Sequence, residues 1–154
     1  MSNQNELIFR KATLQDEAQL LGMMRILAEQ EPCKVAFDLN AVSATFRRFL
    51  NLPTFGGVWL LCVKQAVVGY IVLTLGFSFE FRGHDAFIDE LYVEPEFRRL
   101  GYGRKAVEFI EQRAHEIGAN ALHLEVDHGN DSALELYRRS GYEDHDRFLM
   151  TKWL

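Results

Sequence analysis

Apolar residues recur along this chain with two different periods, which separate the expected strands from the expected helices. Short runs rich in β-branched and aromatic residues are typical of strands, whereas apolar residues three or four positions apart are typical of amphipathic helices. We expect strands at 7–11, 58–63, 67–79, 86–93, 121–126 and 148–153. We expect helices from the Thr13 cap to Pro32, from Asp38 to Leu50, at 103–117 and at 131–139. This order predicts a single α/β domain over residues 1–154, with a mixed, largely antiparallel sheet flanked by helices on both faces.

Composition and charge narrow the class of protein. Apolar residues make up 48% of the 154 positions and charged residues 25%, which is ordinary for a globular domain. The formal net charge of −5 argues against a nucleic-acid-binding surface, which is usually basic. Cys33 and Cys62 have no metal-ligand or redox spacing, and no apolar run is long enough for a membrane span. We therefore expect a cytoplasmic protein with no metal, no membrane partner and no nucleic-acid partner.

A turn rich in glycine and arginine joins strand 86–93 to helix 103–117. It contains Arg98, Arg99, Leu100, Gly101, Tyr102, Gly103 and Arg104. Backbone N–H groups without a helical partner collect at such a helix start, and the helix dipole adds partial positive charge. Glycines let a polyanion approach this backbone, so the turn suits a phosphate or a pyrophosphate.

Two familiar phosphate-binding motifs fit this turn poorly. A P-loop requires Gly-x-x-x-x-Gly-Lys-Ser/Thr, and the chain contains no such string. The stretch 101–106 formally fits a dinucleotide fingerprint, with Glu125 or Asp127 about where a ribose-binding acid would lie. That fingerprint begins at the strand end, whereas here residues 94–100 intervene. The antiparallel hairpins upstream also do not build the parallel sheet that a dinucleotide fold requires, so this interpretation is disfavoured.

A third interpretation of this turn rests on a family resemblance. Residues 98–103, Arg-Arg-Leu-Gly-Tyr-Gly, match the Arg/Gln-x-x-Gly-x-Gly/Ala signature of the GNAT acetyltransferase superfamily, and 91–95 resemble the strand end before it. Residues 130–142 resemble the family's second block, Asn-x-x-Ala-x-x-x-Tyr-x-x-x-Gly-Phe/Tyr. Arg99 departs from many members, which carry Gly there. The resemblance implies a GNAT-type fold and acetyl-coenzyme A (acetyl-CoA) as cosubstrate.

The resemblance also implies which residues bind acetyl-CoA. In the family the pyrophosphate lies on the amides of the glycine turn, here Arg98, Arg99, Leu100, Gly101, Tyr102, Gly103 and Arg104. The pantetheine arm pairs with the preceding strand, here Leu91, Tyr92 and Val93, and an amide near Val93 would stabilise the oxyanion. Asn130 resembles the family Asn that hydrogen-bonds the pantetheine. The plainer roles are a solvated basic turn for the arginines and a helix-start residue for Asn130.

Three residues are candidates for proton transfer. The matching Tyr of the family faces the coenzyme sulfur as general acid, which implies this role for Tyr137; a core aromatic is the alternative. An acceptor amine must lose a proton, and Asp89 and Glu90 lie where polyamine acetyltransferases carry paired acids. Strand alternation favours Asp89 as base because it shares a face with Leu91 and Val93, unless a bulge shifts the phase. Glu90 would then contact the substrate ammonium or serve as a structural ion-pair partner. For either acid, the alternative to a catalytic role is a structural one.

The sequence thus predicts an N-acetyltransferase in which an amine attacks the thioester of acetyl-CoA directly. The paired acids and the acidic balance favour a small cationic amine or polyamine as acceptor. The alternatives are a drug-like amine such as an aminoglycoside as acceptor, a protein lysine or N-terminal acetyltransferase, and an acetyl-CoA-binding sensor without turnover. A homodimer is a further expectation, because the aromatic C-terminal strand ending at Trp153 can serve an interface.

Overall fold

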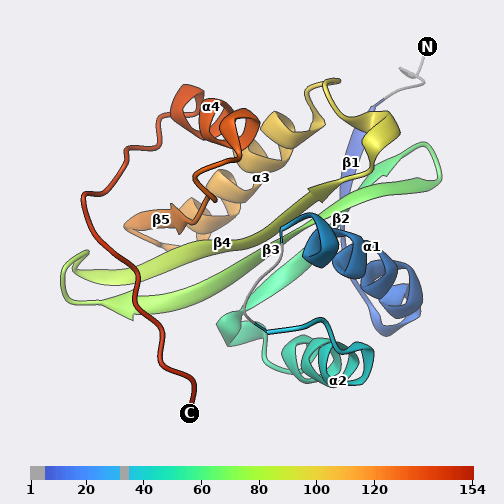
Figure 1. Ribbon diagram of the computed structural model, residues 1–154, viewed down its shortest axis with the longest axis horizontal. Coiled ribbons are helices and arrows are strands. Elements are labelled where there is room, and N and C mark those ends of the chain that lie inside the picture. Colours follow the sequence, from blue (N-terminus) through green and yellow to red (C-terminus); the bar gives the residue numbers. More distant parts are fainter. Residues whose placement is uncertain (1–5, 32–34) are drawn as a thin grey trace.

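A five-stranded sheet forms the centre of the molecule in the computed structural model, which describes residues 6–31 and 35–154 (Figure 1). The strands lie side by side in chain order: β1 (Leu7–Lys11), β2 (Gly56–Val63), β3 (Ala66–Ser78), β4 (Gly83–Val93) and β5 (Ala121–Leu124). The pairs from β1 to β4 are antiparallel, whereas β4 and β5 are parallel. The predicted mixed, largely antiparallel sheet is confirmed.

Helices cover both faces of this sheet, as predicted. Figure 1 shows α1 (Glu17–Gln30) and α2 (Leu39–Leu50) on one face, and α3 (Tyr102–Ile117) and α4 (Asp131–Arg139) on the other. Three short 3-10 turns complete the order: η1 (Leu14–Asp16), η2 (Pro53–Phe55) and η3 (Pro95–Phe97). The η3 turn lies between β4 and α3, directly before the glycine turn.

Apolar side chains on the two faces of the sheet build two separate cores. Alternation along β3 sends Ile71 and Leu73 into the core with Ile110 of α3. The intervening positions face the other way, so that Tyr70 packs in the core with Leu20 of α1. All five side chains are fully buried. The sheet is therefore fixed from both sides, and β4 lies within it between β3 and β5.

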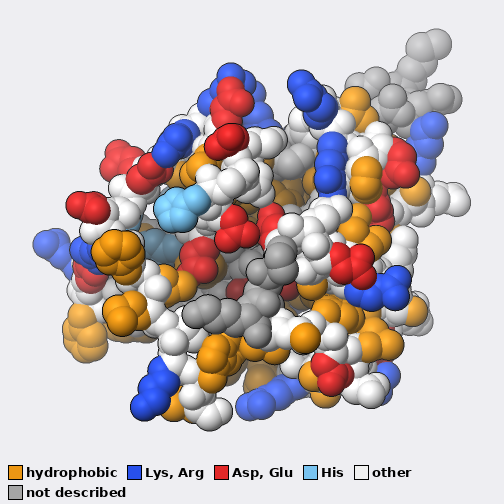
Figure 2. Space-filling view, in the orientation of Figure 1, with side chains coloured by type: hydrophobic (Ala, Val, Ile, Leu, Met, Phe, Trp, Pro, Cys, Tyr) orange, Lys and Arg blue, Asp and Glu red, His pale blue; other side chains and the backbone are white. Residues whose placement is uncertain are grey.

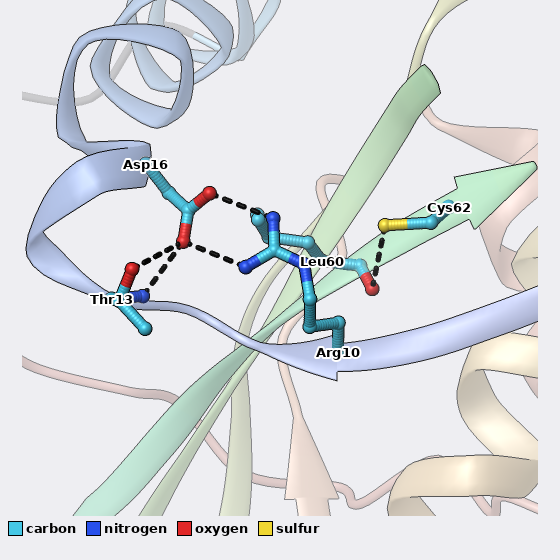
Figure 3. Close-up of polar contacts among 5 residues, drawn as sticks. All are labelled: Arg10, Thr13, Asp16, Leu60 and Cys62. Carbon is cyan, nitrogen blue, oxygen red and sulfur yellow. Dashed lines mark hydrogen bonds and ion pairs between the residues drawn. The ribbon is translucent and has the colours of Figure 1, made fainter. Parts of the chain in front are cut away.

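An ion pair fixes the corner between β1 and α1 (Figure 3). Arg10 donates two hydrogen bonds to the carboxylate of Asp16, at 2.9 and 2.7 Å, and the backbone N–H of Thr13 donates to the same group at 2.8 Å. The hydrogen bonds from Arg10 lower the pKa of Asp16 to about 2. The predicted helix start at Thr13 is confirmed, although its first turn is the η1 turn.

The predicted strand at 148–153 is wrong. Residues 143–154 form no helix or strand, and the large apolar side chains among them are exposed. A strand needs a neighbour for its backbone hydrogen bonds, and the described residues supply none for this segment. Pro32, the predicted end of the first helix, and Cys33 lie outside the described residues. No helix in the described part of the chain has the length and apolar character needed to cross a membrane.

Candidate active site

A β-bulge interrupts β4 where the two candidate acids lie. Consecutive residues of β3 pair with Ile88 and Glu90, so Asp89 is an extra residue in this strand. Because of this insertion, Ile88 and Leu91 lie three positions apart and still pack in the same core, against α3. The bulge shifts the phase of β4. The simple alternation that placed Asp89 on the face of Leu91 and Val93 therefore does not apply.

The second half of β4 is open on the side of β5. The two strands pair only from Asp85 to Ile88, where β5 ends. On the β3 side, Glu94 N–H donates to Val68 O at 2.8 Å. Successive strand amides point to opposite edges, so the N–H of Val93 points to the open side. An extended ligand can hydrogen-bond to β4 along this edge.

The glycine turn after β4 leaves free amides at the start of α3. Gly101 is the N-cap and has a φ of 81°, in the left-handed region that glycine adopts without strain. The first bond of the helix runs from Lys105 N–H to Gly101 O at 3.1 Å, so the amides at 102–104 precede the helical ladder. These amides and the helix dipole make the turn suitable for an anion.

Arg98 connects the glycine turn to β4 and to α1. Its Nε donates to Val93 O at 2.8 Å, and its Nη2 donates to the Gln30 side chain at 3.0 Å. The guanidinium also lies over the ring of Tyr92, 5.7 Å from the ring centroid. Arg98 therefore fixes the position of the turn, in addition to any contact with an anion.

The other two arginines of the turn differ from Arg98. Arg99 is exposed and has a φ of 62°, which costs a non-glycine residue about 1–2 kcal/mol. This left-handed backbone gives a physical reason why glycine suits the same position in the resembling proteins. Arg104 is exposed on the first turn of α3 and donates to Glu108 at 2.8 Å.

Glu90 forms a hydrogen bond inside the face that α1 and α2 cover. Tyr70 donates its hydroxyl hydrogen to Glu90 Oε2 at 2.8 Å. Burial raises the pKa of Glu90, and the bond from Tyr70 partly offsets this increase. Asp89 is exposed at the bulge when the whole residue is considered. The surrounding protein nevertheless desolvates its carboxyl group, and this raises the pKa of Asp89. Both carboxylates are therefore stronger proton acceptors than free carboxylates.

A cavity of about 420 Å³ adjoins the bulge, and its lining is acidic. Asp85, Asp89 and Glu125 line it, and none of the described lining residues is Lys or Arg. Figure 2 shows acidic side chains gathered beside a histidine near the middle of this face. Asp85 Oδ1 is buried without a hydrogen-bond partner among the described residues, and Oδ2 lies 3.7 Å from His123 Nε2. The cavity therefore suits a cation.

Helix α4 places two predicted residues near the end of α1. Asn130 is the N-cap of α4 and accepts from Ala133 N–H at 3.2 Å, which confirms its helix-start role. Its Nδ2 also donates to Glu31 Oε1 at 3.0 Å. Burial raises the pKa of Tyr137 to about 12, and the charge of Glu31 adds to this increase. Tyr137 therefore keeps its phenolic proton at neutral pH.

Five of the predicted residues, Asp89 to Val93, lie on the open half of β4, and the glycine turn follows this strand after the η3 turn. Glu31, directly after α1, accepts the hydrogen bond from Asn130 of α4, and its charge raises the pKa of both Glu90 and Tyr137. Sequence reasoning missed Glu31, Tyr70 and Asp85 as parts of this region. Tyr70 could have been recognised from the sequence, because it is the one polar side chain in the otherwise apolar run 67–73.

Comparison with known proteins identifies a matching family. Residues 20–142 match the family model described as the Acetyltransferase (GNAT) family. A thialysine N-epsilon-acetyltransferase from Bos taurus is 32% identical over 144 residues, which cover 89% of this chain and 84% of that protein.

Solved structures share the fold. Integron cassette protein HFX_CASS3, from the mobile metagenome of Cole Harbour Salt Marsh, superposes with a TM-score of 0.82 at 32% identity, over 95% of this chain and 90% of the other. The aminoglycoside N-acetyltransferase AAC(6')-Iy in complex with CoA gives a TM-score of 0.81 at 12% identity, over 99% and 98% of the two chains. This second likeness shows the fold alone.

Proposed function

This chain belongs to the GNAT acetyltransferase family and is an acetyl-CoA-dependent N-acetyltransferase; on that premise we propose that its acceptor is a small cationic amine or polyamine. The observation that carries the proposal is the acidic cavity beside the bulge, next to the open edge of β4. Transfer proceeds by direct attack of the amine on the thioester, because no cysteine lines this cavity among the described residues.

The described residues fit acetyl-CoA at two places. The left-handed Gly101 and the free amides at 102–104 suit the pyrophosphate, with Leu100 and the arginines around them. The open edge at 91–93 suits the extended pantetheine arm, and Asn130 lies at the start of the neighbouring α4. Acetyl-CoA, when bound, supplies the thioester. In this proposal the N–H of Val93 stabilises negative charge on the carbonyl oxygen.

The acids of the bulge prepare the acceptor amine. An alkyl ammonium with a pKa near 10.4 is neutral at pH 7 only at a cost of roughly 4.6 kcal/mol. Asp89 lines the cavity and accepts the proton, directly or through water, and its raised pKa improves this transfer. Glu90, held by Tyr70, contributes negative charge that positions the ammonium.

Tyr137 supplies the proton that the departing thiolate needs. Its pKa of about 12 keeps the hydroxyl protonated, and a thiol has an ordinary pKa of about 8.5. The phenol therefore stays protonated at neutral pH. Because its pKa lies above that of the thiol, it acts by donating a hydrogen bond to the sulfur as the C–S bond breaks, and it recovers any transferred proton from solvent. In this role Tyr137 is a general acid rather than only a packed aromatic.

Two further considerations support a small acceptor. The bovine relative is named for thialysine, which favours a small amine over a folded protein. The cavity volume of about 420 Å³ lies within the range of small-molecule sites, about 300–1,000 Å³.

A panel of amines with acetyl-CoA, read by thiol release, tests the proposal. The panel contains diamines, polyamines, thialysine, aminoglycosides and lysine or N-terminal peptides. We expect at least one small cation to be acetylated with a kcat/KM about tenfold or more above any peptide. A preferred peptide would indicate a protein acetyltransferase, and no turnover on any acceptor would indicate a sensor.

Two variants link the acceptor to the cavity. Asp85→Asn should raise the KM for the best cation without changing acetyl-CoA affinity, because Asp85 lines the cavity away from the glycine turn. The matched control is Asp144→Asn, which removes a surface carboxylate paired with Arg138 outside the cavity. Equal KM values in both variants would contradict the acceptor site.

A further inference from the structure

A histidine of β5 lies beside Asp85, the cavity acid on β4. In the sheet, Asp85 pairs with Gly76 of β3 on one side and with Ala121 of β5 on the other. A Cβ at Gly76 would lie 2.7 Å from Asp85 Oδ1, whereas Oδ2 lies 3.7 Å from His123 Nε2. The carboxylate of Asp85 therefore lies over the sheet, with one oxygen close to Gly76 and the other facing His123.

The contact between Asp85 and His123 is incomplete. Oδ1 of Asp85 and Nε2 of His123 are both buried, and neither atom has a hydrogen-bond partner among the described residues. The 3.7 Å between Oδ2 and Nε2 is too long for a hydrogen bond. Because a buried polar atom without a partner is unfavourable, the carboxylate favours a cation as its neighbour. Two cations can take that place: an ammonium in the cavity, or the imidazolium of His123.

Two aromatic rings hold the imidazole of His123 beside Asp85. The ring of Phe81, in the turn between β3 and β4, packs against it with a centroid distance of 4.5 Å. His145 of the C-terminal segment packs edge-on, with a centroid distance of 6.4 Å. Figure 2 shows histidine and acidic side chains together on this face. His123 is therefore held from two sides, and a small shift brings it within hydrogen-bond distance of Asp85.

The acids of the cavity favour a positive charge on His123. Asp85 faces it from β4, and Glu125, two residues further along the chain from His123, lines the same cavity. Asp89 lines the cavity beyond them. Histidine is the side chain that ordinarily changes charge between pH 5 and 8. The proton on His123 is therefore the variable charge in this group at physiological pH.

The hairpin and the C-terminal segment add three further charged groups. Arg147 donates to both carboxylate oxygens of Glu80, at 2.9 and 2.7 Å, so these two charges largely cancel. The hydrogen bond from Arg147 lowers the pKa of Glu80, and the charges of His145 and His123 contribute to the decrease. His145 is thus the neighbouring group that opposes a positive charge on His123.

We propose that His123 controls acceptor binding by competing with the acceptor cation for Asp85, an inference that rests on the proposed function of the cavity. The protonated imidazole pairs with Asp85 and cancels its charge, whereas the neutral imidazole leaves Asp85 to the ammonium. Binding of the cation therefore releases the proton of His123 to solvent, and acid weakens binding. His123 is a positioning residue, because it acts through Asp85 and contacts no reacting atom.

Binding of tetramethylammonium at two pH values tests this role. This ion keeps its charge at every pH and cannot be acetylated, so the titration of the acceptor itself does not enter. We expect its dissociation constant, measured by calorimetry on the full chain, to rise about fivefold or more from pH 7.5 to pH 5.5. His123→Gln is neutral at both values and should lose this increase. Protonation of Asp89, whose pKa is raised, affects both proteins equally and cancels in the comparison.

A second histidine variant and a spectroscopic readout complete the test. His145→Gln is the matched control, since it removes the adjacent imidazole and should keep the dependence on pH. Linkage is reciprocal, so saturating tetramethylammonium should move the NMR titration of the His123 ring to lower pH by about 0.7 units for a fivefold effect. The melting temperature of each variant checks that the fold is retained.

The outcomes separate this role from the proposed function. If tetramethylammonium binds at neither pH, the acceptor site is wrong, and the role of His123 is wrong with it. If the ion binds with the same pH dependence in the wild type and in His123→Gln, only the role of His123 is overturned. A dependence that His145→Gln abolishes and His123→Gln keeps would overturn it as well, because the proton would then belong to His145.

Discussion

The two halves of β4 differ in how their backbone is used. From Asp85 to Ile88 the strand has a partner on both edges, β3 and β5, and the side chains of Ala86 and Ile88 are packed in the core. From Asp89 to Val93 it keeps β3 alone, and the other edge is open. The closed half contributes stability through burial. The open half leaves hydrogen-bonding groups for a ligand, and the candidate catalytic residues lie along it.

The largest expected effect concerns the open half. Tyr137→Phe removes one hydroxyl and keeps the ring packing, so turnover should fall about 100-fold or more while acetyl-CoA affinity stays within a few-fold. Tyr142→Phe is the matched control, because its ring contacts Tyr137 at 5.7 Å between centroids. Steady-state kinetics and cofactor titration measure both. Equal losses in the two variants would mean that the hydroxyl of Tyr137 has no special role.

A core substitution in the closed half should change stability instead. Ile88 is 4% exposed, and Ile88→Ala should lower the free energy of unfolding by about 2–4 kcal/mol. Acetyl-CoA affinity of the folded protein should be unchanged within a few-fold. Chemical denaturation and titration measure the two quantities. Ile8→Ala is the control, since Ile8 is 54% exposed on β1 and should cost much less. A large loss of affinity in Ile88→Ala would show that the two halves are not separable.

Substitution in the glycine turn should change affinity rather than stability. Gly103→Val adds a side chain at the free amides and should weaken acetyl-CoA binding by about tenfold or more. The fold should survive, because a Cβ at Gly103 would lie 3.6 Å from Leu136, an ordinary contact. Gly22→Val on α1, also without a close neighbour, controls for the change in helix propensity. If Gly103→Val unfolds without ligand, the turn is structural.

The smallest effect concerns the pH profile. The bond from Tyr70 lowers the raised pKa of Glu90, so Tyr70→Phe should raise that pKa and move the acidic limb of kcat/KM upward by up to about one pH unit. In the wild type, Glu90 has a raised pKa in the folded state. The free energy of unfolding therefore decreases as the pH rises through that pKa. Tyr92→Phe, which removes a similar bond to Glu94, is the control. If the acidic limb of kcat/KM does not move in Tyr70→Phe, the titration of Glu90 does not contribute to the pH dependence of the rate.

The sequence predicted most of this arrangement, and the failures have physical causes. Local signals placed β4, α3 and the glycine turn, because turn residues and helix starts are read from neighbouring positions. The bulge at Asp89 depends on which residue of β3 lies opposite, and no pattern within β4 reveals that pairing. The strand expected at 148–153 failed for a similar reason, since composition favours a strand but only a neighbour makes one. Glu31 joins the site through α4, across about a hundred residues of sequence.

An open strand edge inside a sheet has a cost beyond catalysis. Any extended polypeptide can add to such an edge, including a segment from a neighbouring molecule, and this is a common route to aggregation. The extended arm of acetyl-CoA in our proposal covers the same backbone groups that a foreign strand would use. A cell well supplied with the cosubstrate would therefore protect this protein from self-association at the wrong edge, and starvation for it would remove that protection.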